Sequence, residues 1–365
     1  MTLHFYFARK FLWTMVGLTL VFAVLLAMVD FVDHLGDFDV EEIGLSNILL
    51  LTVLNSPTAL YQILPLLMIL STVALFVSLA RSSELVVSRA IGRSGLVTLI
   101  APVIVALLIG VLAVSTANPI VAATSKRFHQ LSDTFKSGGQ NTLSIGRDGI
   151  WLRQGGHEGQ TVIHAARANP EGNVLYGTTF VAYATEGGPV RRIEAERAEL
   201  QPGAWRLVNA KVWPLIAGIN AEANAASHEE LFVASSLTED RIRDSFGNPA
   251  VISVWDLPGF ISDLEEAGFS ARRHTVWLHM ELAQPLFLVS MVLIAAAFTM
   301  RHARLGGTGI AVITTLLLGF GLYYVRNFAQ ILGENGQIPH TLAAWAPPVA
   351  AIMLGLGLLL HMEDG

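Results

Sequence analysis

Long apolar segments alternate with polar ones along this chain, and six of the apolar segments contain no Lys, Arg, Asp or Glu. Three of them precede a polar stretch of about 165 residues and three follow it. Each has at least 18 residues, and a helix of that length covers roughly 27 Å, close to the ~30 Å hydrocarbon core of a bilayer. The pattern predicts six transmembrane helices, at residues 11–29, 57–80, 95–117, 283–300, 308–325 and 342–360.

The polar stretch has the pattern of a β-domain. Between residues 143 and 253, short runs rich in Val, Ile, Thr, Tyr and Trp alternate with turn signals that contain Gly and Pro. Apolar and polar positions alternate in the runs 192–200 and 203–213, as in antiparallel strands with one buried face. The regular spacing predicts a sandwich or jelly roll. Such a domain either only packs against its neighbours, or accepts a lipid or docks another β-domain edge to edge.

The predicted organisation is an α-helical integral membrane protein with 3+3 transmembrane helices and an inserted extracytoplasmic β-jelly-roll domain. The helical period returns after Leu257-Pro258-Gly259 and predicts a helix that connects to the fourth span. The boundaries are residues 1–118 for the first three helices, 119–257 for the β-domain, 258–282 for the connecting helix and 283–365 for the last three helices.

Composition supports a membrane protein and excludes several other classes. Apolar residues make up 53% of the chain and charged residues 14%, whereas a soluble domain has about 25% charged residues. The absence of cysteine excludes disulfides and thiolate metal sites. A net charge of −6 argues against nucleic-acid binding.

Loop charges predict the topology. The segments 30–56 and 333–341 contain no Lys or Arg, whereas the opposite set of flanks holds Arg9, Lys10, Arg81, Arg89, Arg93, Arg301 and Arg304. Because positive flanks remain in the cytoplasm, both termini are expected there, with the β-domain on the other side. The first span is longer than the ~7–15 residues of a signal-peptide core, so we expect an uncleaved anchor.

Motifs for catalysis are missing from the sequence. None of the four lysines follows a glycine, so there is no Gly-Lys-Ser/Thr loop for nucleotide phosphates. The sequence also lacks His-Glu-x-x-His and Gly-x-Ser-x-Gly. We therefore expect neither an enzyme nor a resident metal or cofactor.

The short segment 81–94, between the second and third spans, predicts an amphipathic helix. On a helical wheel one side carries Arg81, Glu84, Ser88 and Gly92, and the other carries Val86, Val87, Ala90 and Ile91. It is either an interfacial helix that rests on lipid or a coupling helix whose polar face enters a groove on a cytoplasmic motor subunit.

Charged residues also gather at the predicted outer ends of the spans. Asp30, Asp33 and Asp37 have the spacing i, i+3, i+7 and share one helical face. They are solvated at the interface, pair with Arg326, or hold a divalent cation that bridges to an anionic lipid. Arg272 precedes the fourth span and could meet lipid phosphates, and Arg326 follows the fifth.

Several segments resemble one known family over nearly the whole chain. These are the segment 81–94, the glycine-containing segment 319–325, the segment 338–347 and the strands 193–212. They are similar to the LptF/LptG permeases, which export lipopolysaccharide. The segment 29–35 looks more like the LptG branch than the LptF branch.

The resemblance implies partners and a location. It implies a heterodimer with an LptF-like permease, two copies of an LptB-like ATPase that bind ATP and Mg, an LptC-like membrane-anchored protein and an LptA-like periplasmic protein. Lipopolysaccharide would be extracted from the bacterial inner membrane and passed to that periplasmic bridge.

The resemblance also implies site residues. The expected contacts with the ATPase are Arg81, Glu84, Leu85, Val87, Ser88 and Arg89. The expected lining of the lipid cavity and gate is Asp30, Asp33, Asp37, Tyr324, Arg326 and Arg272. Some members of the family carry a basic residue where this chain has Asp30, so the charge facing lipid phosphates is expected from the partner permease, Arg326 or a bound divalent cation.

Two other classes stay open on the sequence alone. One is a membrane-anchored hydrolase with its site in the β-domain, against which the missing motifs argue. The other is a structural or sensor protein whose spans only anchor a binding domain. The amphipathic segment and the number of spans argue against that class.

Overall fold

The computed structural model describes residues 2–38, 43–90, 94–137, 143–146, 149–156, 159–169, 173–184, 188–215, 218, 220–235, 237, 248–266, 269–300 and 308–364. The chain divides into two compact units. The membrane unit comprises Met1–Ser132, Ala250–Trp255 and Arg272–Gly365, and the β unit comprises Asp133–Pro249 and Asp256–Ala271.

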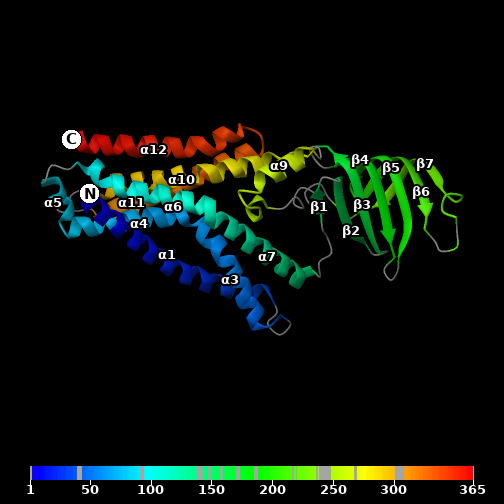
Figure 1. Ribbon diagram of the computed structural model, residues 1–365, viewed down its shortest axis with the longest axis horizontal. Coiled ribbons are helices and arrows are strands. Elements are labelled where there is room, and N and C mark those ends of the chain that lie inside the picture. The colour runs from blue at the N-terminus through cyan, green and yellow to red at the C-terminus, as the bar shows by residue number, and fades with distance from the viewer. Residues whose placement is uncertain are drawn as a thin grey trace. The chain divides into compact units, whose positions relative to one another are not determined.

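Helices build the membrane unit (Figure 1). The first half of the chain supplies α1 (Thr2–Asp37), α3 (Leu45–Gln62), α4 (Leu64–Arg81), α5 (Glu84–Ala90), α6 (Gly95–Leu112), the π-helical turn η1 (Ala113–Ala117) and the start of α7 (Asn118–Ser137). The rest is the short helix η2 (Pro249–Val251), α10 (Arg272–Thr299), α11 (Thr308–Glu334) and α12 (His340–Asp364).

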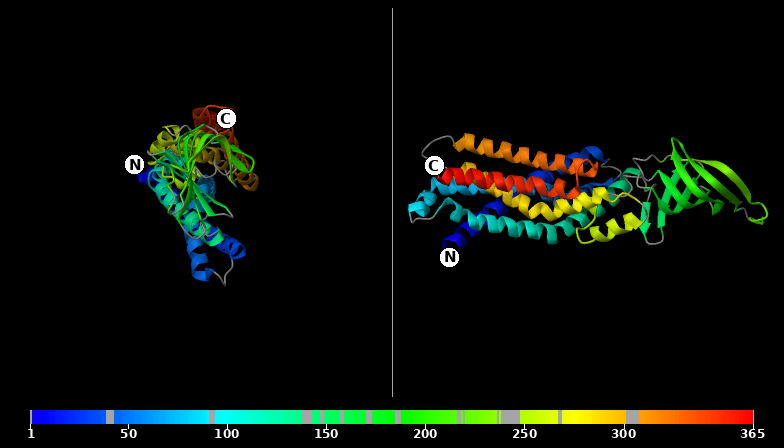
Figure 2. Two further views of the ribbon diagram at one scale, coloured as in Figure 1. Left: turned by 90° about the vertical axis from the view of Figure 1, so that its right-hand side faces the viewer. Right: turned by 90° about the horizontal axis from the view of Figure 1, so that it is seen from above.

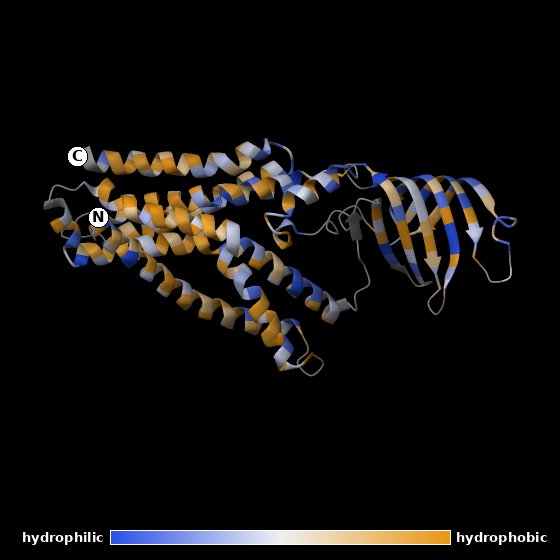
Figure 3. Ribbon diagram, viewed as in Figure 1, coloured by the Kyte–Doolittle hydropathy of each residue, from blue (hydrophilic) through white to orange (hydrophobic). Residues whose placement is uncertain are grey.

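Six helices in the described part of the chain are long and apolar enough to cross a membrane. They are α1, α4, α6 with its continuation through α7, α10, α11 and α12. In Figure 3 the ribbons of these helices are coloured largely as hydrophobic. This agreement confirms the six predicted spans. The second begins later than expected, because α3 ends at Gln62 and a new helix begins at Leu64. Pro65 explains the break, since proline lacks an N–H and suits the first turn of a helix.

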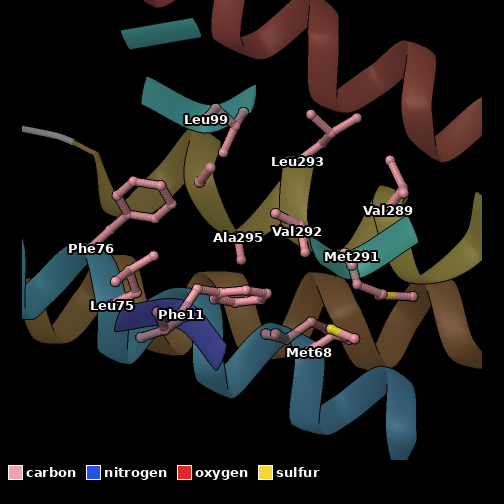
Figure 4. Packing of buried hydrophobic residues seen from close by; sticks show 14 of the residues in the cluster. Phe11, Met68, Leu75, Phe76, Leu99, Val289, Met291, Val292, Leu293 and Ala295 are labelled. Carbon is pink, nitrogen blue, oxygen red and sulfur yellow. The ribbon is translucent and has the colours of Figure 1, made fainter. Parts of the chain in front are cut away.

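The core of the membrane unit lies around α10, which packs against α4, α6, α11 and α12. Figure 4 shows α10 side chains meeting residues of α1, α4 and α6. The labelled side chains of α10 are Val289, Met291, Val292, Leu293 and Ala295, and those facing them are Phe11, Met68, Leu75, Phe76 and Leu99. All residues of α10 from Val289 to Ala295 are buried, as expected of a helix at the centre of a bundle.

Glycines let neighbouring helices approach α10 closely. A Cβ added to Gly110 of α6 would lie 2.5 Å from the Cα of Pro285. One added to Gly355 of α12 would lie 2.9 Å from the Cβ of Leu293. Both distances are too short for real atoms, so these contacts need glycine, as in other membrane helix pairs.

One antiparallel sheet forms the β unit, with its strands in sequence order (Figure 2). The strands are β1 (Leu143–Gly146), β2 (Gly149–Gly156), β3 (Gly159–Ala168), β4 (Val174–Tyr183), β5 (Pro189–Gln201), β6 (Ala204–Pro214) and β7 (Ala226–Ala234). Alternate residues point to one face, where Phe180, Ile193 and Trp205 are buried. Leu264 of the helix α9 (Leu257–Glu266) joins the same core.

The sheet curls until the end of β7 reaches β2. The side chain of Gln154 on β2 donates from Nε2 to the carbonyl oxygen of Ala234, at 3.1 Å. Its Oε1 accepts a hydrogen bond from Ser235 Oγ at 2.8 Å. The predicted β-domain insert is confirmed, with the strands in meander order. The segment 118–137, most of which we expected to belong to that domain, is helical instead.

Candidate functional site

The short helix α5 is tied to the first span by an ion pair. Lys10 Nζ on α1 lies 3.0 Å from Glu84 Oε1, at the first residue of α5. Ser82 Oγ donates to the same carboxylate oxygen at 2.8 Å. Burial alone would raise the pKa of the Glu84 carboxyl, but the hydrogen bonds from Lys10 and Ser82 outweigh it and hold that pKa below its ordinary value. The pair therefore stays ionised and joins α5 to α1.

The polar side of α5 faces the helix bundle rather than solvent. Ser88 is buried, with its Oγ 3.4 Å from Thr98 Oγ1 of α6, and Leu85 is also buried. Val86 and Val87 remain 49% and 57% exposed. This orientation is the reverse of the one expected from the helical wheel, where the polar face was free for a partner. The reason is that Lys10 and Thr98 give the polar side chains partners within the chain.

The other residues predicted to contact an ATPase lie around α5. Arg81 ends α4 and is exposed. Arg89 lies within α5, but its side chain is outside the described residues, as are residues 91–93. Of the six predicted contacts, the geometry therefore leaves Arg81 and Val87 available to a partner, engages Glu84 with Lys10, and turns Leu85 and Ser88 inward.

The three aspartates at the end of α1 have separate surroundings. Asp30 Oδ2 accepts a hydrogen bond from Asn55 Nδ2 of α3 at 2.9 Å, whereas Asp33 and Asp37 are exposed. Between them His34 is buried, with its Nδ1 3.3 Å from Thr52 Oγ1. No group of three or more His, Cys, Asp or Glu in the described segments has an arrangement that could hold a metal ion. The geometry therefore does not support a preformed cation site at these aspartates.

Arg326 turns towards α10 rather than towards Asp30. Its Nη2 donates to the carbonyl oxygen of Met280 at 3.2 Å, and its guanidinium lies 4.8 Å from the centroid of the Phe287 ring. The acidic group whose charge acts on it is Glu281 of α10. The possible Asp30–Arg326 pair is therefore replaced by two interactions, Asp30 with Asn55 and Arg326 with α10. The sequence pattern did not single out Glu281, because it lies just outside the charge-free span 283–300 and its partners Tyr61 and Arg326 are distant in sequence.

Two further predicted cavity residues lie at different places on the membrane unit. Tyr324 of α11 is exposed, with its ring next to that of Tyr323. The guanidinium of Arg272, at the start of α10, lies against Gly336 in the loop after α11, where a Cβ would collide with it. The structure brings Tyr324 and Arg326 together on α11, whereas the aspartates lie on α1.

An apolar groove of about 510 Å³ lies in the membrane unit beside η1. Its lining comes from α1, α3, α4, α6, η1 and α7, and includes Thr19, Leu60, Tyr61, Leu64, Leu112, Ala113, Ala117 and Ile120. π-Helical turns often occur at functional positions. The volume falls within the usual 300–1,000 Å³ of small-molecule sites, and the lining suits hydrocarbon.

Comparison with known proteins identifies a family. A family model described as the lipopolysaccharide export system permease LptF/LptG matches residues 5–361. The chain belongs to the LptF/LptG family. The lipopolysaccharide export system permease protein LptG of Haemophilus influenzae is 23% identical over 380 residues, which cover 100% of this chain and 99% of that protein. LptG of Escherichia coli K12 is 23% identical over 375 residues, 96% of each chain.

The LptF/LptG assignment confirms the family expected from the sequence segments. The two relatives carry the LptG name, in agreement with the LptG-like sequence of residues 29–35. The match extends over the spans, α5 and the β unit alike.

Proposed function

We propose that this chain is a permease subunit of a transporter that extracts lipopolysaccharide from the bacterial inner membrane, powered by ATP hydrolysis in a separate subunit. The observation that carries this proposal is the arrangement of α5, which presents Val86 and Val87 outward while Glu84 is bound to Lys10 of the first span. A force applied to α5 from outside the chain therefore reaches α1 directly.

The orientation of the protein follows from its loop charges. The positive flanks Arg9, Lys10 and Arg81 favour a cytoplasmic side for α5 and the termini, and we propose that the β unit lies in the periplasm. The docking surface for an LptB-like ATPase is then the exposed apolar edge formed by Val86 and Val87, with Arg81 beside it. Complete burial of an exposed valine contributes about 1.5–3 kcal/mol, and because Val86 and Val87 are already about half-buried, docking would gain about half of that from each.

The lipid pathway and the partner permease would use the least buried spans. In the 18-residue apolar stretch of each span, only 6% of the residues of α1 and 11% of those of α11 are buried within the chain. The corresponding share for α10 is 78%. The exposed faces of α1 and α11 include Val24, Met28, Leu317 and Tyr324. We propose that these faces meet an LptF-like permease and line the lipid cavity, while α10 is the fixed centre of the bundle.

Recognition of the lipid phosphates would rely on few cations of this chain. The end of α1 offers Asp30 rather than a basic residue, and Asp30 is engaged with Asn55. Arg272 is the candidate cation, because it is exposed whereas Arg326 turns towards α10, and further charges would come from the partner permease. We propose that the chain itself is non-catalytic, that ATP and Mg bind to the ATPase, and that LptC-like and LptA-like proteins receive the lipid from the β unit.

Depletion of the chain in its native bacterium tests this proposal. Newly made lipopolysaccharide should accumulate in the inner-membrane fraction of a density gradient and fall in the outer-membrane fraction. Normal delivery of lipopolysaccharide after depletion, with growth arrested for another reason, would favour an anchoring or sensor role instead.

A further inference from the structure

A buried carboxylate in the membrane unit is surrounded by polar groups from several helices. Glu281 of α10 is 3% exposed. The hydroxyl of Tyr61, at the end of α3, donates to its Oε2, and the side chain of Asn118, at the start of α7, hydrogen-bonds to the same carboxylate. Asn118 is held in turn, because its Oδ1 accepts a hydrogen bond from the backbone N–H of Val254 at 2.8 Å. Two neighbouring helices, α3 and α7, therefore hold the carboxylate of α10 in place.

Arg326 of α11 is the cation whose charge acts on this carboxylate, without a direct ion-pair contact between the two side chains. The guanidinium donates to Met280, the residue directly before Glu281, and lies over the ring of Phe287 on the same helix. Its Nε is buried and has no hydrogen-bond partner among the described residues. The hydrogen bond to Met280 and the contact with the Phe287 ring both direct Arg326 from α11 towards α10.

The charges explain why the two residues must occur together. A single ionised side chain within a membrane span is costly, so such residues face the bundle and pair with one another. Removing one member of a buried pair leaves the other uncompensated and destabilises the protein more than replacing both. Glu281 and Arg326 together carry no net charge, and both lie in helices that are long and apolar enough to cross a membrane.

We propose that Glu281 is a positioning residue that acts as the counter-ion of Arg326. With Tyr61 and Asn118 holding the carboxylate, the pair fixes the rotation of α11 against α10. That rotation directs Tyr324 outward. The inference deepens the proposed function. The existence of the pair does not depend on that function, but its consequence for transport rests on it, because it requires α11 to border the lipid cavity.

A double-mutant cycle on the full chain tests the pair. The variants are Glu281→Gln, Arg326→Gln and the double variant, purified in mild detergent and compared by thermal unfolding. We expect each single variant to lower Tm by about 5 °C or more and the double variant to recover most of that loss. The matched control combines Glu281→Gln with Arg273→Gln, because Arg273 is an exposed arginine of the same helix. That control should show no recovery.

Several results would overturn the proposal. Additive losses in the double variant, or equal recovery with Arg273→Gln, would show that Arg326 is not the counter-ion. If Glu281→Gln does not fold, the yield of monodisperse protein replaces Tm, and a double variant that also fails to fold contradicts the pair. The cycle needs neither lipid nor ATPase. A negative result in the cycle would therefore not count against the proposed transport function, and a disproof of that function would not change the interpretation of the cycle.

Discussion

Lys10 donates a hydrogen bond to Glu84 over a separation of 74 residues, with 3.0 Å between Nζ and Oε1. The side chains of Lys10 and Glu84 are 26% and 30% exposed, so the pair is only partly open to water. Glu84 stands in the first turn of α5, where a negative charge is also favoured by the helix dipole. The contact joins the helix proposed to dock the ATPase to the span proposed to face the lipid.

Breaking this pair should uncouple ATP hydrolysis from lipid binding with little loss of fold. We expect Lys10→Met to lower Tm only slightly, because partly exposed ion pairs contribute about 0.2–1 kcal/mol. The stimulation of ATPase activity by added lipopolysaccharide should fall several-fold in the purified complex. Arg9→Met is the matched control, since Arg9 is exposed on the same turn of α1. Equal stimulation in both variants would contradict the coupling role.

The same pair gives a pH dependence with a defined sign. The pKa of Glu84 is lowered from the ordinary value of 4.5. Its stabilisation is therefore fully present above pH 4.5 and is lost as the pH falls through the lowered value. The difference in Tm between the wild type and Glu84→Gln should be constant from pH 7 to about pH 5 and shrink below that. A difference that grows on acidification would be inconsistent with an ionised Glu84.

The exposed valines of α5 should decide binding of the ATPase. Val87→Asp places a charge in the proposed apolar contact, and we expect the ATPase to be lost from the purified complex while Tm of the chain stays unchanged. Val190→Asp, a similarly exposed valine in the β unit, is the control. Retention of the ATPase at the wild-type level by Val87→Asp would refute the proposed docking surface.

Most of the fold follows from sequence patterns, because span length, loop charge and alternation act locally. The six spans and the strands around Ile193 and Trp205 are of this kind. The orientation of α5 could not be predicted, since Glu84 and Ser88 find partners on α1 and α6 that are distant in sequence. Glu281 was missed for the same reason, as only the fold brings Tyr61 and Arg326 to it.

Close helix packing gives a prediction that does not depend on function. Gly110→Ala would place a Cβ 2.5 Å from the Cα of Pro285, so the backbones of α6 and α10 must move apart. We expect a loss of about 1–3 kcal/mol, measured as a lower unfolding temperature. Gly357→Ala is the control, because a Cβ there has no described atom within 4 Å. The packing account fails if the two variants unfold at the same temperature.

The most direct test of the central claim is purification of the tagged chain from native membranes in mild detergent, followed by ATPase assays with and without lipopolysaccharide. The account predicts that a second permease of similar layout and a nucleotide-binding subunit accompany the chain, and that lipopolysaccharide changes the ATPase rate. A single protein without ATPase activity, or an ATPase that ignores lipopolysaccharide, would contradict it.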